Sequence, residues 1–158
     1  MIKVGSRVPP LRLARLCHGL PEAVDTERYL AARRSIIVGV PGAFTPVCTA
    51  EHVPSFIAQA DALARSGFSR ITCVVGNDPW VTAQWAEMLD PAGRIDFLSD
   101  GNFALARALG AMSSAVDMFM GERPTRYLMV TRDCVVERLR LEASPVSLTC
   151  TRPEDVFL

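Results

Sequence analysis

The residues of this sequence best suited to chemistry are its five cysteines, and Cys48 has the most distinctive setting. It closes the run PGAFTPVC, which follows a short apolar segment over 35–40 and precedes a segment over 49–65 with helical spacing. A cysteine at the start of a helix faces unpaired N–H groups and a partial positive charge. Both favour the thiolate, which is the nucleophilic form of the side chain. The sequence therefore predicts a reactive thiol at position 48.

The residues around Cys48 fit a site that cleaves a weak O–O bond. The hydroxyl of Thr45, close in the chain, can both donate and accept a hydrogen bond. Pro41 and Pro46 have no N–H group and a fixed φ, so they stiffen the loop without competing for hydrogen bonds to the sulfur. Together with the amides of Val47 and Cys48 and one guanidinium, these groups would stabilise the oxygen that leaves a cleaved peroxide. The spacing alone does not choose that arginine from the others.

The remaining cysteines and histidines argue against other kinds of cysteine site. The five cysteines are an odd number with wide spacing, and no two of them form a Cys-x-x-Cys pair. No structural disulfide framework is therefore expected. Only two histidines accompany them, so we expect no metal site, and nothing in the sequence indicates a cofactor.

Composition and charge narrow the class of protein. The 158 residues fit a single domain over 1–158, and 49% hydrophobic with 22% charged residues is typical of a soluble globular chain. Seventeen basic residues balance seventeen acidic ones, so neither nucleic acid nor a membrane is an expected partner. The sequence has no secretory signal and no run long enough to span a bilayer, which indicates a cytoplasmic protein. Import into an organelle by a presequence that has been removed stays open as an alternative.

The order of predicted elements indicates an α/β fold with a mixed central sheet flanked by helices. Pro54 falls inside the helix after Cys48 and is expected to kink it, because it removes a backbone donor. Asn77 or Asp78 would cap the helix over 79–89. The predicted strands are 35–40, 71–75, 95–98, 127–130 and 135–141, with the last two as a hairpin, and the predicted helices are 49–65, 79–89, 104–109 and a short one after Pro153.

The run PGAFTPVCTAEHVPSF resembles the peroxiredoxin family, in particular its peroxiredoxin 5 or type II branch. That branch carries Pro-Gly-Ala-Phe-Thr-Pro-x-Cys, followed by His and by Pro-x-Phe. The resemblance extends over nearly the whole chain, because further segments also match the family. These segments are IKVG at 2–5, VVGND at 74–78, Trp85, RYLMV at 126–130 and SLTC at 147–150.

The resemblance implies a thioredoxin-like fold and a thiol-dependent peroxidase. Cys48 would be the peroxidatic cysteine, which a hydroperoxide oxidises to sulfenic acid. Pro41, Thr45 and Arg126 would complete the active site. Hydrogen peroxide and organic hydroperoxides would be the substrates, and thioredoxin, glutaredoxin or glutathione would be the reductant. The resemblance also implies a homodimer.

Which thiol resolves the oxidised Cys48 stays open in the sequence. Cys150 stands in the Leu-Thr-Cys context of the resolving cysteine in atypical two-cysteine members of the animal type. Cys73 matches a position discussed for plant-type members, but it lies in an apolar strand, where a buried and inert thiol is the simpler interpretation. An external thiol such as glutathione or glutaredoxin is the third alternative.

Three residues near Cys48 modify its expected surroundings. His52 would support the site by hydrogen bonding around it, or would simply pack or cap inside the helix. Val47 replaces the small or polar residue that is usual before the cysteine, and would narrow the mouth of the pocket. Glu51 adds a negative charge that would disfavour the thiolate unless its carboxylate points to solvent.

Two other functions are compatible with a reactive Cys48. A general thiol–disulfide oxidoreductase of the same fold is one, although the missing Cys-x-x-Cys pair argues against it. A redox sensor that changes a binding surface when Cys48 is oxidised is the other.

Two features outside the site carry expectations of their own. Cys134, in the predicted hairpin turn, is expected to be an exposed free thiol. The methionines at 112, 118 and 120 and Phe119 would either line a hydrophobic patch near a dimer contact or pack into the core.

Overall fold

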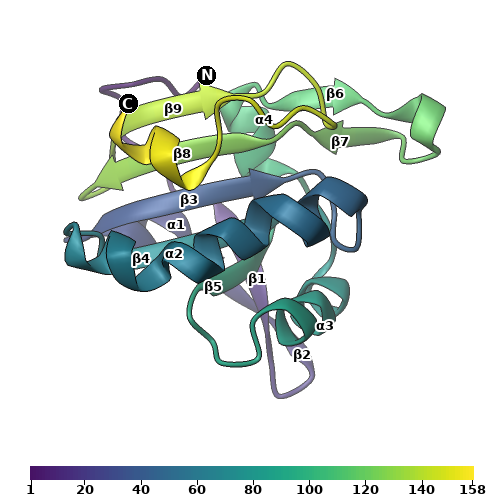
Figure 1. The fold of residues 1–158 in the computed structure, drawn as a ribbon, viewed down its shortest axis with the longest axis horizontal. Helices are drawn as coiled ribbons and strands as arrows, with labels where there is room; N and C mark the ends of the chain where they lie inside the picture. The colour runs from purple at the N-terminus through teal and green to yellow at the C-terminus, as the bar shows by residue number, and fades with distance from the viewer.

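A seven-stranded mixed sheet forms the centre of the molecule, with helices on both of its faces (Figure 1). The structure is a computed structural model that describes residues 1–158. None of its helices has the length and apolar character of a membrane-spanning segment.

The sheet has the order β2-β1-β5-β4-β3-β8-β9, and a second sheet, β6-β7, projects from the body. The strands are β1 (Arg12–Cys17), β2 (Leu20–Asp25), β3 (Arg34–Val40), β4 (Arg70–Val75), β5 (Asp96–Ser99), β6 (Met112–Ser114), β7 (Glu122–Pro124), β8 (Tyr127–Arg132) and β9 (Val135–Leu141). The helices are α1 (Thr26–Leu30), α2 (Val53–Arg65), α3 (Pro79–Leu89) and α4 (Ala104–Leu109), with a π-helical turn η1 (Cys48–His52) and two 3-10 turns, η2 (Val116–Met118) and η3 (Pro153–Phe157).

The central strands come from the most apolar runs of the sequence. β3 and β4 pair in parallel, with Val38 opposite Cys73, and both strands are buried over nearly their whole length. β8 pairs with the other edge of β3 in the antiparallel sense, and β9 completes the hairpin. Strands that are covered on both faces need continuous rather than alternating apolar residues. The structure confirms the predicted α/β fold with a mixed sheet, and it places strands and helices at all the predicted segments.

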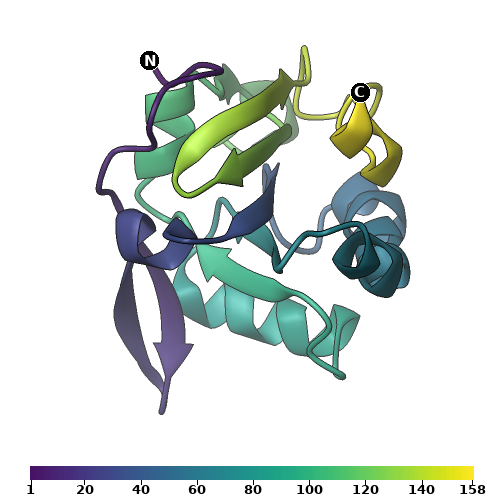
Figure 2. The same ribbon diagram turned by 90° about the vertical axis from the view of Figure 1, so that its left-hand side faces the viewer.

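Helices on the two faces of the sheet enclose two hydrophobic cores (Figure 2). The core under α2, α3 and η3 contains Phe56 and Ile36, whereas the core under α1 and α4 contains Leu105 and Ile37. Neighbouring residues of β3 serve opposite cores because successive side chains of a strand point to opposite faces. The sheet therefore supplies apolar surface to both layers of helices.

The sequence analysis missed two hairpins, β1–β2 and β6–β7, because neither contains a run of apolar residues. β1 exposes Arg12 and Arg15, and it joins the main sheet through a single pairing of Ala14 with Ser99. β6 and β7 are three residues each and form a short arm away from the main sheet (Figure 1). Such strands depend on their neighbours rather than on local propensity.

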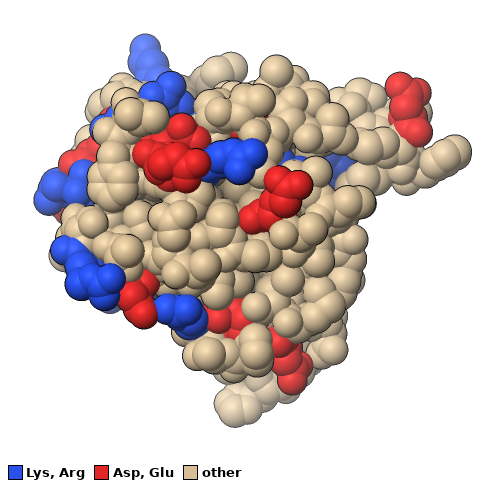
Figure 3. Space-filling model, in the orientation of Figure 1, with Lys and Arg blue, Asp and Glu red and all other residues tan.

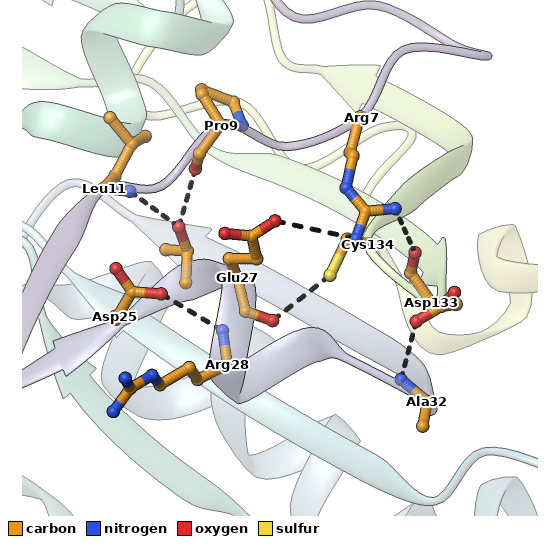
Figure 4. Close-up of polar contacts among 10 residues, drawn as sticks. Arg7, Pro9, Leu11, Asp25, Glu27, Arg28, Ala32, Asp133 and Cys134 are labelled. Carbon is orange, nitrogen blue, oxygen red and sulfur yellow. Dashed lines mark hydrogen bonds and ion pairs between the residues drawn. The ribbon is translucent and has the colours of Figure 1, made fainter.

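The expectation that Cys134 is an exposed thiol is wrong, because the β8–β9 turn packs against α1 (Figure 4). Cys134 is 0% exposed, and its thiol donates a hydrogen bond to the carbonyl of Glu27 at 3.2 Å. Arg7 also joins the turn to α1, because its guanidinium lies near both the Glu27 carboxylate and the Asp133 carbonyl. Turn residues in the sequence predict the turn but not the segment that covers it.

Gly39 in β3 allows the ring of Tyr127, its partner in β8, to lie directly on the strand. An alanine Cβ at position 39 would lie 2.0 Å from Tyr127 Cε1. We expect Gly39→Ala to lower the free energy of unfolding by about 1–3 kcal/mol through overpacking, as measured by urea denaturation. Gln59→Ala on the exposed side of α2 is the control, with an expected change below about 0.5 kcal/mol. An unchanged midpoint for Gly39→Ala would contradict the close ring contact.

Candidate active site

Cys48 lies in the first turn of the helical segment that follows β3. A short loop leaves the strand, and helical backbone begins at Pro46. The Thr49 N–H donates to the Thr45 carbonyl at 3.0 Å, which opens the helical ladder. The N–H groups of Val47 and Cys48 therefore have no partner within the helix. The sulfur sits in the positively polarised first turn, where the sequence predicted it.

The helix accommodates Pro54 through η1, a π-helical turn that begins at Cys48 itself. Pro54 has no N–H to donate to the carbonyl of Ala50, four residues earlier. Instead, the Val53 N–H donates to the Cys48 carbonyl, five residues back. The disturbance that the sequence predicted as a kink is thus a widened turn at the Cys48 end of the helix. Single π-helical turns occur frequently at functional sites.

Arg126 brings its guanidinium into contact with the sulfur of Cys48. Nη1 lies 2.9 Å from Cys48 Sγ, and the residue is only 2% exposed. The other two hydrogen bonds of the guanidinium go to backbone carbonyls, from Nε to Ser147 and from Nη2 to Pro145, both at 2.9 Å. Because arginine does not lose its proton in proteins, the sulfur faces a permanent positive charge that water barely screens.

Thr45 and Pro41 shape the loop above Cys48 without touching its sulfur through a hydrogen bond. The Thr45 hydroxyl donates to the Gly42 carbonyl at 2.9 Å, and Pro41 is buried. Among the four predicted catalytic residues, the structure joins Cys48 and Arg126 directly. Thr45 is half-buried and lies three residues before the cysteine.

Asn77 holds this loop in place, a role that the sequence analysis did not assign. Its Oδ1 accepts the Ala43 N–H at 2.8 Å. Asp78, rather than Asn77, caps α3, because its carboxylate accepts the N–H groups of Trp80 and Val81. Of the two residues predicted as caps, Asp78 therefore caps the helix and Asn77 binds the loop. The position of Asn77 two residues after the buried strand β4 was the signal in the sequence that could have indicated this role.

An aromatic contact supports the same loop from α3. Phe44 has a φ of 60°, a left-handed conformation that is uncommon for a residue with a side chain. Its ring lies against that of Trp85, with 6.5 Å between centroids. The Trp85 Nε1 also donates to the Thr49 hydroxyl at 3.2 Å. The buried indole thus contacts both the loop and the first turn of the helix, and holds the strained residue in place.

His52 fastens the C-terminal segment to the helix that carries Cys48. Its Nε2 lies 2.7 Å from the Thr151 carbonyl, so this nitrogen carries the proton and donates it. Burial lowers the pKa of His52 to about 4, and the positive charge of Arg126 contributes to the same direction. The imidazole is therefore neutral at physiological pH. Its Nδ1 has no hydrogen-bond partner.

The two candidate resolving cysteines differ in their environments. Cys73 is buried within β4, and burial raises the pKa of its thiol well above the ordinary value, with the nearby charge of Cys48 adding to the effect. Cys150 lies in the segment after β9 and is partly exposed. Burial also raises the pKa of Cys150, and the carboxylate of Glu142 adds to the shift. All five cysteines are free thiols.

Glu51 and Val47, which modify the expected surroundings of Cys48, both lie at the start of the helix. Glu51 is exposed, so its carboxylate points to solvent and its effect on the sulfur is screened by water. Val47 is half-buried beside the loop. No group of three or more histidine, cysteine and acidic side chains gathers in an arrangement that could hold a metal ion.

A thioredoxin-like sheet with a buried cysteine at a helix start, whose sulfur contacts a buried guanidinium, defines a thiol-based redox protein.

The family model described as Redoxin matches residues 3–154. Rice peroxiredoxin-2E-2, a chloroplastic protein from Oryza sativa subsp. japonica, is 37% identical over 159 residues, which cover 97% of this chain and 70% of the relative. The structure is similar to that of reduced Prx3 from Vibrio vulnificus in complex with hydrogen peroxide, with a TM-score of 0.91, 32% identity and coverage of 99% and 97% of the two chains.

A third similarity is to peroxiredoxin 5 from Alvinella pompejana, with a TM-score of 0.81, 28% identity and coverage of 90% of this chain and 91% of the other. The chain belongs to the peroxiredoxin family, within the redoxins.

His52 makes the stability of the protein depend on pH. Its pKa is about 4 in the folded protein against 6.5 in a free side chain, so between these values the unfolded chain binds more protons. Stability therefore falls as the pH drops from 6.5 towards 4, by up to about 1.4 kcal/mol per pH unit. We expect His52→Gln, which keeps a donor for the Thr151 carbonyl, to flatten this slope in urea unfolding. His18→Gln, at the other and exposed histidine, is the control and keeps the slope. An equal slope in His52→Gln would contradict the depressed pKa.

Proposed function

We propose that this chain is a peroxidase in which the thiolate of Cys48 reduces hydrogen peroxide and organic hydroperoxides. The observation that carries the proposal is the 2.9 Å contact between Arg126 Nη1 and Cys48 Sγ in a buried site. A permanent cation against the sulfur, together with the first turn of a helix, favours the ionised and nucleophilic form. The same groups then face the oxygen on which negative charge develops.

In the first step, the thiolate attacks the outer oxygen of the hydroperoxide. A sulfur–oxygen bond forms, the O–O bond breaks, and the sulfur passes two electrons to the peroxide to become a sulfenic acid. The other oxygen takes a proton from solvent and leaves as water or alcohol. Its developing negative charge would be stabilised by Arg126 and by the free N–H groups of Val47 and Cys48. The Thr45 hydroxyl would orient the peroxide, and Pro41 would shield the sulfur from water.

The burial of the site favours small substrates. Cys48 is 0% exposed, so a hydroperoxide reaches the sulfur only if the residues around it move. Phe44, in the loop before Cys48, is 54% exposed and would offer an apolar surface to the alkyl part of an organic hydroperoxide. Val47 would narrow the approach to the sulfur.

Recycling requires a second thiol, and we propose that either Cys150 or an external thiol supplies it. The attacking thiolate forms a disulfide with the sulfenic sulfur and releases water, and a thioredoxin, glutaredoxin or glutathione then reduces that disulfide. Cys150 lies on the same segment whose carbonyls contact Arg126, and it is partly exposed. Cys73 is the weaker candidate, because it is fully buried and the strand β4 that carries it would have to move.

We further propose that the chain acts as a homodimer of single-domain subunits in the cytoplasm. The turn at the end of the β6–β7 arm exposes Val116, Met118 and Phe119, which are 62%, 42% and 99% accessible to solvent. In Figure 3 most of the arm is tan, and an acidic side chain lies near its end. Exposed apolar side chains at the end of a projecting hairpin, even with the exposed Asp117 among them, are suited to contact with a second subunit. Met118 and Phe119 favour the surface-patch alternative over core packing, whereas Met112 and Met120 are half-buried.

Loss of the sulfur or of the guanidinium should separate their contributions. We expect Cys48→Ser to abolish peroxide consumption in a coupled assay with a thiol reductant. Arg126→Lys should reduce the second-order rate constant by about 10²–10³-fold, because a lysine ammonium does not reproduce the guanidinium contacts. Cys17→Ser, at the end of β1, is the control and should keep the wild-type rate. Equal rates for wild type and Cys48→Ser would refute the proposal.

Intact-mass analysis after one equivalent of hydrogen peroxide would identify the resolving thiol. If Cys150 resolves Cys48, the wild type should form an intramolecular disulfide and Cys150→Ser should accumulate the sulfenic acid. Cys73→Ser should behave like the wild type. A sulfenic acid that persists in the wild type until glutathione is added, and then gives a glutathione adduct, would assign recycling to an external thiol instead.

A further inference from the structure

The guanidinium of Arg126 depends on a loop for its orientation. Two of its three hydrogen bonds are to carbonyls of Pro145 and Ser147, in the loop over 144–151 that we term the strap. Within the strap, the Ser147 N–H donates to the Ser144 carbonyl at 3.2 Å and the Ser144 and Ser147 hydroxyls lie 2.8 Å apart, which shapes the turn but does not attach it to the rest of the protein. Contacts with residues outside the strap must therefore hold it in place if Arg126 is to keep its Nη1 on Cys48.

Glu142 is the side chain that holds the strap. It is 3% exposed, and its carboxylate accepts four hydrogen bonds, all from residues of the strap. Oε1 accepts the N–H groups of Thr149 and Cys150 at 2.7 and 2.8 Å and the Thr151 hydroxyl at 3.0 Å. Oε2 accepts the Thr149 hydroxyl at 2.8 Å. None of the six ion pairs of the protein involves Glu142.

A buried carboxylate without a cation is costly unless its hydrogen bonds replace the lost water. Burial would raise the pKa of Glu142, but the donors from the strap outweigh it and lower the pKa below its usual value. The carboxylate is therefore ionised at neutral pH, and its hydrogen bonds are of the stronger, charge-assisted kind. Glu142 is therefore the main anchor of the strap to the body of the protein, with His52 as a second anchor at the Thr151 carbonyl.

The backbone of Glu142 is itself hydrogen-bonded to the segment that carries Arg126. The Glu142 N–H donates to the Arg126 carbonyl at 2.9 Å, and the Glu142 carbonyl accepts the Thr125 hydroxyl at 2.8 Å. The backbone at 125–126 thus fixes Glu142, the Glu142 side chain fixes the strap, and the carbonyls of the strap fix the guanidinium. We propose that Glu142 is a positioning residue for the peroxidase reaction, which holds Arg126 against Cys48 through the strap.

This inference rests on the proposed function, and it predicts that the position of the carboxylate matters more than its charge. Glu142→Asp keeps the charge but withdraws the carboxylate by about 1.5 Å, the length of one C–C bond. Glu142→Gln keeps the position, because an amide oxygen can replace Oε1 and the amide N–H₂ can donate to the Thr149 hydroxyl. A direct effect of the negative charge on the sulfur would give the opposite order of the two variants.

The test measures the second-order rate constant for oxidation of Cys48 by hydrogen peroxide in a single turnover, with trapping of the sulfenic acid and intact-mass detection. We expect a decrease of about tenfold for Glu142→Asp, since small misplacements at a site have effects of this order, and of about threefold or less for Glu142→Gln. Glu137→Asp, on the same strand β9 and paired with Arg34 and Arg132, is the control and should leave the rate unchanged.

A double-mutant cycle separates positioning from a general loss of stability. In an Arg126→Lys background, which lacks the guanidinium, Glu142→Asp should reduce the rate by less than about twofold, because its route to the sulfur is already gone. Thermal unfolding checks that each variant is folded. If Glu142→Asp does not fold, Thr149→Val removes the donor to Oε2 and should give a smaller decrease that also disappears in the Arg126→Lys background.

Three outcomes would overturn the inference: a wild-type rate in Glu142→Asp, a larger loss in Glu142→Gln than in Glu142→Asp, or an equal loss in both backgrounds. A wild-type protein whose Cys48 does not react with peroxide would instead refute the proposed function. The two failures are therefore distinguishable within one experiment.

Discussion

The buried contact between the guanidinium of Arg126 and the sulfur of Cys48 is the interaction on which the other features of the site depend. A charge with 2% exposure must find acceptors for its N–H groups, and this one has the sulfur and two carbonyls. The sulfur is the only one of the three acceptors that belongs to a side chain. Burial thus makes the position of Cys48 part of the hydrogen bonding of Arg126.

The topology of the sheet brings these two residues together across 78 positions of the chain. β8 lies beside β3, and Tyr127 pairs with Gly39. Arg126, directly before Tyr127, is therefore beside the end of β3, where the loop to Cys48 begins. The antiparallel neighbour of a strand starts where that strand ends, so the contact follows from the strand order and the register. The close packing of Tyr127 on Gly39 helps to fix this register.

The surroundings of the site consist of rigid parts joined by short polar links. Asn77 and Trp85 support the loop before Cys48, and His52 and Glu142 tie the C-terminal segment to the other side. Trp85 and His52 lie in helical segments, and Asn77 and Glu142 follow within two residues of the ends of β4 and β9. A neutral His52 fits this structural role, because a charged imidazole beside Arg126 would add a like charge to a buried site.

The sequence by itself determined the place of Cys48 at a helix start, the central strands and the helices, because these depend on local patterns: apolar runs, turn residues and the PGAFTPVC loop. Choosing Arg126 needed the family resemblance. The β1–β2 and β6–β7 hairpins, the burial of Cys134 and the role of Glu142 were decided only by the tertiary structure. These features depend on contacts between segments far apart in the chain. Such contacts stabilise the fold without producing a recognisable residue pattern in either segment alone.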